Sequence, residues 1–268
     1  MSNEQHPVVV HADEAALGRA VAAEIADLMS AAAAADAPFL LGCPGGRTPA
    51  STYAALADEI ADRGLDLSRV VIVMMDDYLQ RDGDGWAHIP ADAHNSCRRF
   101  AYEDIQAVLN RAVPAERALP RENVWFPDPA DPAAYDGRIR SAGGIDFFIL
   151  ASGAGDGHVA FNPPGSSSDS RSRIVELAEQ TRRDNLATFP DFPSIDAVPT
   201  HGVTVGIATI AELSKAATML LVGADKQAAF ERLTTGQGYD PAWPATVYRL
   251  VAGSALHADA DAAVAQGA

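Results

Sequence analysis

Short apolar runs, each followed by a polar turn and then a helical pattern, most constrain how this chain can fold. Their length and their content of β-branched and aromatic residues are typical of buried strands. Four of them are especially clear: Phe39–Leu41, Val70–Met75, Ile145–Leu150 and Ala217–Val222. Strands that alternate with helices predict an α/β fold, a three-layer sandwich in which helices cover both faces of a mostly parallel sheet.

Helices are expected between these strands. The clearest begins at the capping residue Asp13 and ends near Ala34, with large apolar residues at helical spacing. Further helices are expected over 50–60, 98–109, 133–141 and 226–233, and shorter strands over 8–10, 123–126, 173–177 and 202–207. The tail after residue 252 is expected to hold an edge strand.

The chain shows no sign of division into separate domains. No shift in composition marks a linker and no internal repeat occurs, so one domain spanning residues 1–268 is expected. Leu79–His94 is polar and rich in turn residues, and a long loop is predicted there. Loops of that length usually act as lids or lack order.

The composition excludes several classes of protein. The formal net charge of −16 and the isoelectric point near 4.7 argue against a nucleic-acid-binding surface, which requires a clustered basic face. The two cysteines, Cys43 and Cys97, follow no disulfide or zinc-site pattern. No run approaches the ~18 apolar residues of a membrane span, and the first residues lack the features of a signal peptide. We therefore expect a cytoplasmic protein with neither a membrane nor a nucleic acid as partner.

A glycine-rich loop follows the apolar run that ends at Leu150. Its sequence, GAGDGH, places Asp156 two residues before His158, beyond the carboxyl end of a buried strand, where open α/β sheets bind ligands. Histidine transfers protons near neutral pH, and a neighbouring carboxylate can orient it. A lone histidine is more often structural, but this position favours a catalytic role. No HExxH-like or carboxylate-rich spacing supports a metal, and none is predicted.

A second cluster, Gly45-Gly46-Arg47-Thr48-Pro49, joins a predicted strand to a helix. Free N–H groups at a helix N-terminus favour anions, glycines let a phosphate approach closely, and arginine adds a charge-assisted hydrogen bond. Thr48 fits the capping position and Pro49 an early helical position. The cluster is neither a Walker A loop nor a GxGxxG fingerprint. By itself it favours a phosphate site and an ordinary strand-to-helix turn about equally.

Charged residues follow two further strands. Asp76 and Asp77 come directly after an apolar run, and a carboxylate at such a strand end can act as a general base when it is partly desolvated. Adjacent side chains diverge, so at most one of the two is expected to enter a site, and capping is the favoured interpretation of the pair alone. Lys226 opens a helix, where its charge opposes the helix dipole unless an anion binds there. An ordinary surface lysine is the alternative.

Taken together, these stretches resemble the glucosamine-6-phosphate deaminase (isomerase) family, whose superfamily also contains the 6-phosphogluconolactonases. The resemblance covers most of the chain and rests on stretches in matching order: LLGCPGGRTPASTY (40–53), VVIVMMDDYL (70–79), GGIDFFILASGAGDGHVAFNPPGSSSDSRSRI (143–174), HGVTVGIATI (201–210) and MLLVGADKQAAF (219–230). GDGH fits both branches of the superfamily, whereas MDDY and the continuation AFNPPGSS resemble the deaminase branch. The resemblance implies a modified Rossmann-like sandwich, a sugar-phosphate substrate and no cofactor, and it is compatible with a homo-oligomer.

The resemblance also implies a role for each candidate residue. His158 would assist opening of the sugar ring, with Asp156 supporting it. Asp76 would move a proton between C2 and C1 as an aldose becomes a ketose and ammonia leaves. The substrate phosphate would be bound by the loop after the first strong strand and by one lysine, through Gly45, Gly46, Arg47, Thr48 and Lys226.

The chain departs from the family pattern at three positions. The family's FNEP motif carries a glutamate that pairs with the histidine, whereas this chain has Pro163. Ala187 stands where a phosphate-binding arginine is expected, and Arg47, which resembles the GGRTP form of the lactonases, is expected to supply that contact instead. Val175 replaces a lysine that helps to bind an allosteric activator, so this regulation is not predicted.

Three functions remain open from the sequence, in order of preference. The first is deaminase-like aldose–ketose isomerisation of an amino-sugar 6-phosphate with release of ammonia. The second is lactone hydrolysis of the 6-phosphogluconolactonase type, in which a histidine activates water and needs no such glutamate. The third is a catalytically weak sugar-phosphate sensor. Whether another carboxylate reaches His158 bears on this choice, and Asp169 and Glu176 are the candidates near it in sequence.

Overall fold

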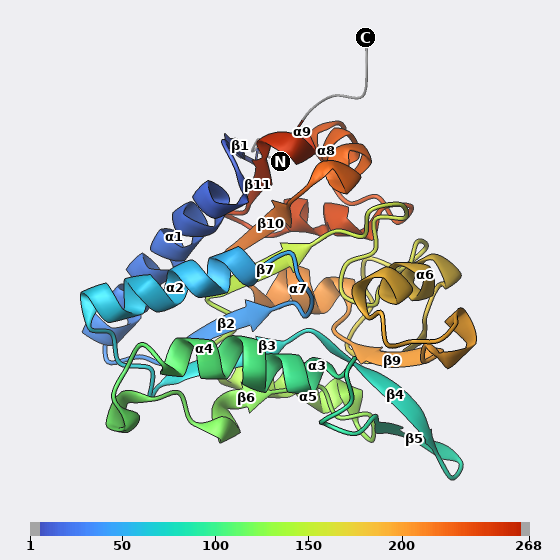
Figure 1. The fold of residues 1–268 in the computed structure, drawn as a ribbon, viewed down its shortest axis with the longest axis horizontal. Helices are drawn as coiled ribbons and strands as arrows, with labels where there is room; N and C mark the ends of the chain where they lie inside the picture. The colour runs from blue at the N-terminus through green and yellow to red at the C-terminus, as the bar shows by residue number, and fades with distance from the viewer. Residues whose placement is uncertain (1–5, 264–268) are drawn as a thin grey trace.

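The computed structural model describes residues 6–263, which form two sheets (Figure 1). The strands are β1 (Val8–His11), β2 (Phe39–Cys43), β3 (Val70–Met74), β4 (Asp76–Asp82), β5 (Gly85–His88), β6 (Val124–Trp125), β7 (Phe147–Ala151), β8 (Arg173–Glu176), β9 (His201–Thr204), β10 (Ala217–Leu221) and β11 (Ala255–Asp259). The larger sheet has the order β1-β11-β10-β7-β2-β3-β6, and all its pairings are parallel. The smaller sheet is antiparallel, in the order β5-β4-β9-β8. The predicted α/β fold with a mostly parallel sheet is confirmed.

Helices cover both faces of the larger sheet (Figure 1). One face packs against α1 (Glu14–Ala34), α2 (Ala50–Arg63), α3 (Cys97–Phe100), a π-helical turn (Ala101–Gln106) and α4 (Ala107–Asn110). The other packs against α5 (Pro132–Ser141), α7 (Ile207–Leu213), α8 (Gln227–Thr234), a 3-10 helix (Pro244–Leu250) and α9 (Ala260–Ala263). α6 (Glu179–Thr188) follows β8, and short 3-10 turns occupy Ala115–Arg117, Arg121–Asn123, Ile195–Ala197 and Ala224–Lys226. No helix within residues 6–263 has both the length and the apolar character that a membrane crossing requires.

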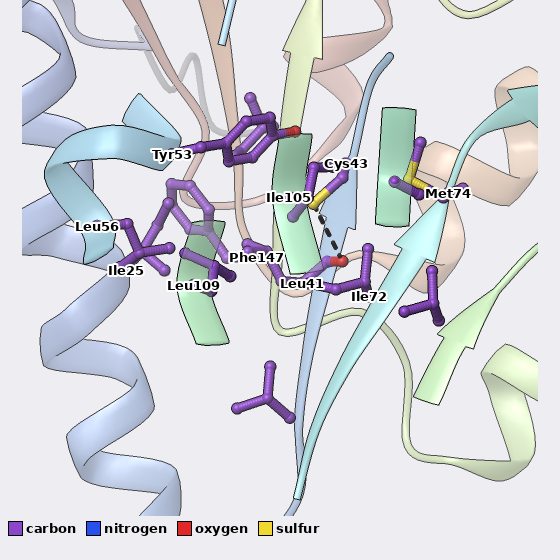
Figure 2. Close-up of a cluster of buried hydrophobic side chains, with 14 of the residues drawn as sticks. Ile25, Leu41, Cys43, Tyr53, Leu56, Ile72, Met74, Ile105, Leu109 and Phe147 are labelled. Atoms are coloured by element: carbon purple, nitrogen blue, oxygen red, sulfur yellow. Dashed lines mark hydrogen bonds between the residues drawn. The ribbon is translucent and has the colours of Figure 1, made fainter. Parts of the chain in front are cut away.

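Alternate residues of the central strands belong to opposite layers of the core, as the pleat of a strand requires. Leu41 and Ile72 pack with the residues of α1 and α2 (Figure 2). Leu40 and Val73 pack with the residues of α5 and α7. Because both faces of the sheet are covered, its central strands are apolar throughout, which is the pattern that predicted them.

Local signals place several helices correctly. α1 begins directly after Asp13, whose Oδ1 accepts a hydrogen bond of 2.7 Å from the Ala16 N–H. α5 begins after Asp131 in the same way. The helix expected over 98–109 is present as α3, the π-helical turn and α4 in succession.

The long loop predicted over Leu79–His94 is wrong in its first half. A single residue, Met75, separates β3 from β4, and β4 forms a hairpin with β5 that is closed where Asp82 pairs with Gly85. Gly83, the first of the two turn residues, has a φ of 56°, which glycine adopts without a steric penalty, so the Gly-Asp pair between the two strands is a hairpin signal. β4 also pairs with β9, and Asp76 therefore begins a strand of the smaller sheet.

Three further expectations need correction. The strand predicted over 202–207 ends at Thr204, and α7 begins at Ile207. The strand expected at the edge of the sheet in the tail is β11, which lies between β1 and β10; β1 forms the edge. The residue pattern also predicts no helix at α6, although this helix reaches the candidate site. Each difference depends on pairing or packing with segments that are remote in the chain.

Candidate active site

A cavity of about 570 Å³ lies at the carboxyl ends of the central strands. The segments after β2, β3, β7 and β10 line it, together with α6. The carboxyl ends of parallel strands meet at one edge of the sheet, where α/β folds bind ligands. Seven of the predicted site residues line this cavity: Gly45, Gly46, Arg47, Thr48, Asp76, His158 and Lys226. The eighth, Asp156, is hydrogen-bonded to one of them.

His158 is held by the carboxylate of Asp156. Asp156 Oδ1 lies 2.7 Å from His158 Nδ1 and accepts a second hydrogen bond, 3.2 Å long, from the His158 backbone N–H. An ionised carboxylate only accepts, so Nδ1 carries a proton and Nε2 of the neutral ring has a free lone pair. Burial acts to raise the pKa of Asp156, but the hydrogen bond and the charge of His158 outweigh it and lower that pKa. Asp156 is therefore ionised beside the ring at neutral pH.

The glycine-rich loop is fixed by the segment around the 3-10 helix Pro244–Leu250. Trp243 packs directly on Gly157, so that a Cβ at residue 157 would lie 2.2 Å from the indole ring. Gly157 also has a φ of 65°, in the left-handed region. Its carbonyl accepts a hydrogen bond of 2.8 Å from the Ala245 N–H, and the Gly153 N–H donates to the His158 carbonyl at 2.8 Å. These contacts set the position of His158 in the cavity.

We expect Gly157→Ala to destabilise the protein more than Gly64→Ala. Gly64 ends α2 with a φ of 62° and has nothing within 4 Å of the position of a Cβ, so its substitution adds only backbone strain, about 1–2 kcal/mol. At residue 157 the same strain is added to the displacement of Trp243, for a loss of roughly 3 kcal/mol in all. Denaturant unfolding of both variants measures the difference. Equal losses would show that Trp243 does not constrain the loop.

Asp76 is a buried carboxylate in the cavity wall. It begins β4 and is only 5% exposed. Burial raises its pKa from 3.8 to about 7, and Asp77 also raises it, whereas Cys97 and the charge of His158 oppose the rise. Cys97 Sγ lies 3.4 Å from Asp76 Oδ1 and donates a weak hydrogen bond. A carboxyl group that titrates near neutral pH can both accept and return a proton during a reaction.

Asp77 faces away from the cavity, because adjacent residues of a strand point in opposite directions. Its carboxylate is fully buried and accepts hydrogen bonds from the backbone N–H groups of Tyr78 at 3.0 Å and Cys97 at 2.9 Å. Its Oδ2 lies 2.8 Å from His88 Nδ1 and 3.2 Å from Arg98 Nε. Asp77 thus joins β4, β5 and the start of α3, and the capping interpretation of the aspartate pair applies to this residue alone.

Arg47 and Lys226 bring positive charge to the cavity wall. The Lys226 side chain is 15% exposed, and its Nζ lies 3.5 Å from Asp225 Oδ2. The expected capping of α2 by Thr48 is wrong: the helix begins at Ala50, and the cap position falls on Pro49, whose side chain has no acceptor. The first N–H groups of α2 therefore have no side-chain cap. Such a helix start beside two cations suits a phosphate group.

α6 contributes polar side chains to the cavity that the sequence analysis does not assign: Thr181, Asp184 and Asn185. The helix has no continuous apolar face, so hydrophobic periodicity does not predict it. The available signal is the pairing of polar residues four positions apart, which supports a helix. Glu179 forms an ion pair with Arg183, and Gln180 Nε2 donates to Asp184 Oδ1 at 2.9 Å.

Among residues 6–263, Asp156, His158 and Asp184 form the group with the spacing of metal ligands. One atom of each residue lies within 4.8 Å of the other two. The 2.7 Å hydrogen bond between Asp156 and His158 already pairs one donor with one acceptor. Within this group, Asp156 and His158 form a hydrogen-bonded carboxylate–imidazole pair, which suits proton transfer.

Sequence comparisons find relatives along nearly the whole chain. The family described as glucosamine-6-phosphate isomerases/6-phosphogluconolactonase matches residues 12–256. A glucosamine-6-phosphate deaminase of Shouchella clausii is 31% identical over 229 residues, which cover 83% of this chain and 84% of that protein. A glucosamine-6-phosphate deaminase of Bifidobacterium longum subsp. infantis is 35% identical over 259 residues, which cover 96% of this chain and 91% of that protein.

Solved structures from both branches of this family share the fold. A monomeric glucosamine-6-phosphate deaminase matches with a TM-score of 0.80 and 27% identity, covering 96% of this chain and 98% of its own. A 6-phosphogluconolactonase from Leishmania guyanensis matches with a TM-score of 0.69 and 18% identity, covering 99% of this chain and 100% of its own. At that identity, the second likeness concerns the fold alone.

Proposed function

Since the chain belongs to the family of glucosamine-6-phosphate isomerases and 6-phosphogluconolactonases, we propose that it is a glucosamine-6-phosphate deaminase. The reaction converts an amino-sugar 6-phosphate and water into a ketose 6-phosphate and ammonia. The proposal rests mainly on one observation: a buried carboxylate with a pKa of about 7, Asp76, lies in the same cavity as His158. Isomerisation needs a base that takes a proton from one carbon and returns it to the next, whereas hydrolysis of a lactone needs no such group.

Opening of the sugar ring is the proposed task of His158. Its Nε2 takes the proton of the C1 hydroxyl, and the imidazolium gives a proton to the ring oxygen as the C1–O5 bond breaks. An aldehyde then forms at C1. Asp156, ionised and hydrogen-bonded to Nδ1, stabilises the imidazolium between the two transfers.

Isomerisation is the proposed task of Asp76. Its carboxylate takes the C2 proton, and the electron pair of that bond forms a C1–C2 double bond. The oxygen at C1 takes up the proton that the substrate ammonium group releases. Asp76 returns its proton to C1, which leaves an iminium at C2; water adds there and ammonium leaves. The raised pKa makes Asp76 a stronger base than an exposed aspartate.

The loop from Gly45 to Thr48 and Lys226 are proposed to bind the phosphate. Arg47 lines the cavity and is proposed to replace the contact of the arginine for which this chain has Ala187. Since the protein carries a formal net charge of −16, these local cations are needed to attract an anionic substrate.

We also infer that the chain forms a single sugar-phosphate isomerase/deaminase-like domain. Both sheets contribute residues to the cavity. Asp76 lies in the smaller sheet, whereas the phosphate loop and His158 lie in segments that follow strands of the larger sheet. All the proposed site residues line this one cavity or are hydrogen-bonded to a residue that does.

Lactone hydrolysis is the second candidate, because Arg47 and Pro163 both depart from the deaminase pattern. Purified protein is given glucosamine 6-phosphate with ammonia release followed, and separately 6-phosphogluconolactone with acid release followed. Ammonia release that depends on Asp76 supports the proposal. Acid release that depends on His158 but not on Asp76 would overturn it. If neither product forms and a sugar phosphate still raises the Tm, the protein is a sensor.

A further inference from the structure

We propose that Asp184 is the second carboxylate partner of His158 and fulfils the role for which Pro163 has no functional group. This inference rests on the proposed deaminase function. It names Asp184 as a positioning residue of that same site, one that acts on the reaction through His158.

Pro163 is unable to assist His158. It has no ionisable group and does not line the cavity, and its carbonyl closes a turn by accepting hydrogen bonds from the Ser166 N–H at 3.1 Å and Oγ at 2.7 Å. The two acids considered from the sequence do not replace it. Asp169 is exposed and accepts a hydrogen bond from a neighbouring serine, and Glu176 is exposed at the end of β8. Neither lines the cavity.

Helix α6 places Asp184 beside His158. Thr181, one turn earlier, has its Oγ1 3.4 Å from His158 Nδ1, and residues three apart on a helix share a face. Asp184 lines the cavity, and one of its carboxylate oxygens, a ring nitrogen of His158 and an oxygen of Asp156 lie within 4.8 Å of one another. Asp184 Oδ1 accepts a hydrogen bond of 2.9 Å from Gln180 Nε2, which orients the carboxylate.

The two carboxylates beside the His158 imidazole have different roles: one orients the ring and the other stabilises its charge. Asp156 fixes the ring orientation through its 2.7 Å hydrogen bond. Asp184 lies within the distance of about 4–6 Å at which an opposite charge favours the protonated form of a base. During the proposed ring opening, His158 is an imidazolium after it takes the proton of the C1 hydroxyl and before it gives a proton to the ring oxygen. The charge of Asp184 stabilises that state.

Asp184→Asn removes the charge and keeps the size of the side chain. We expect kcat for ammonia release to fall about 10- to 100-fold, by analogy with the loss seen when the carboxylate that supports a metal-bound histidine is removed. The Kd of an open-chain amino-sugar alcohol 6-phosphate, which cannot cyclise and therefore reports binding alone, is expected to change less than about twofold. Asp184→Glu is expected to retain more activity than Asp184→Asn. Glu179→Gln, an exposed acid on the same helix, is the matched control and is expected to leave kcat unchanged.

The outcomes separate this inference from the proposed function. A parent protein that releases no ammonia refutes the proposed function itself. If the parent is active, an unchanged kcat in Asp184→Asn overturns the role of Asp184, and so do equal losses in Asp184→Asn and Asp184→Glu at unchanged Tm. If Asp184→Asn unfolds at a lower Tm, the comparison of Asp184→Glu with Asp184→Asn decides the matter, because a charged Asp184→Glu variant that is no more active than Asp184→Asn contradicts a role for charge.

Discussion

Asp76→Asn is expected to lower kcat for ammonia release by at least about 1000-fold, within the range that a positioned acid–base group contributes. The amide has nearly the same size as the carboxyl group but is unable to take the C2 proton. The proposed phosphate contacts are unchanged, so the Kd of the amino-sugar 6-phosphate is expected to stay within about threefold of the parent value. Steady-state kinetics and equilibrium binding measure the two quantities. A variant that keeps more than about a tenth of the parent activity contradicts the assigned role.

The same carboxylate predicts the pH profile of the parent enzyme. Asp76 must be ionised to remove the C2 proton, and its pKa is about 7. The logarithm of kcat/KM is therefore expected to rise with pH up to about 7 and to level off above it. If kcat/KM instead rises around pH 4, where an exposed aspartate titrates, then burial does not raise the pKa of Asp76 in the active protein.

Stability is expected to change in the opposite direction to activity. The pKa of Asp76 in the folded protein is raised above its ordinary value, so the folded state loses stability as pH rises from about 4 to about 7 and the buried group ionises. Asp76→Asn removes this loss and is expected to be more stable than the parent at pH 8, by at most about 4 kcal/mol. Little difference is expected at pH 4. Denaturant unfolding at both pH values tests this, and equal effects at the two would contradict it.

Asp77→Asn is expected to lower the free energy of unfolding by about 3–5 kcal/mol, the usual loss when one partner of a buried ion pair is removed. The substitution removes the carboxylate that pairs with the Arg98 guanidinium. It also places the NH₂ group of asparagine, a donor, next to groups that donate to Asp77 in the parent protein, such as the Cys97 N–H. Denaturant unfolding at pH 7 measures the change. Asp84→Asn, at the exposed tip of the same hairpin, is the control and is expected to alter stability by less than about 0.5 kcal/mol. A loss below about 1 kcal/mol at residue 77 would show that Asp77 does not hold the hairpin.

The larger sheet is predictable because its signals are local. Its central strands are buried on both faces and are therefore apolar throughout, and Asp13 caps α1 within three residues of its own position. The smaller sheet lacks such signals. The second half of β4 is exposed and charged, and its partner β9 begins more than a hundred residues later. A prediction from neighbouring residues therefore assigns a loop there.

Some residues of the candidate site are likewise predictable from local sequence, whereas others depend on contacts between remote segments. The glycine-rich loop with Asp156 and His158 carries its signal within a few residues, because an acid and a histidine after a buried strand reach the ligand-binding edge of a parallel sheet. Which of Asp76 and Asp77 reaches the cavity depends on the pleat of β4 and on the partners that Asp77 finds in β5 and α3.

The α/β class, the family and the residues at the four strand ends are predictable from the amino-acid sequence, since each is encoded in contiguous stretches of chain. The packing of the layers was needed to show that α6 brings Asp184 within 4.8 Å of His158 and that Pro163 does not line the cavity. A polar helix has little hydrophobic periodicity, and contacts between residues 26 positions apart depend on how the layers pack.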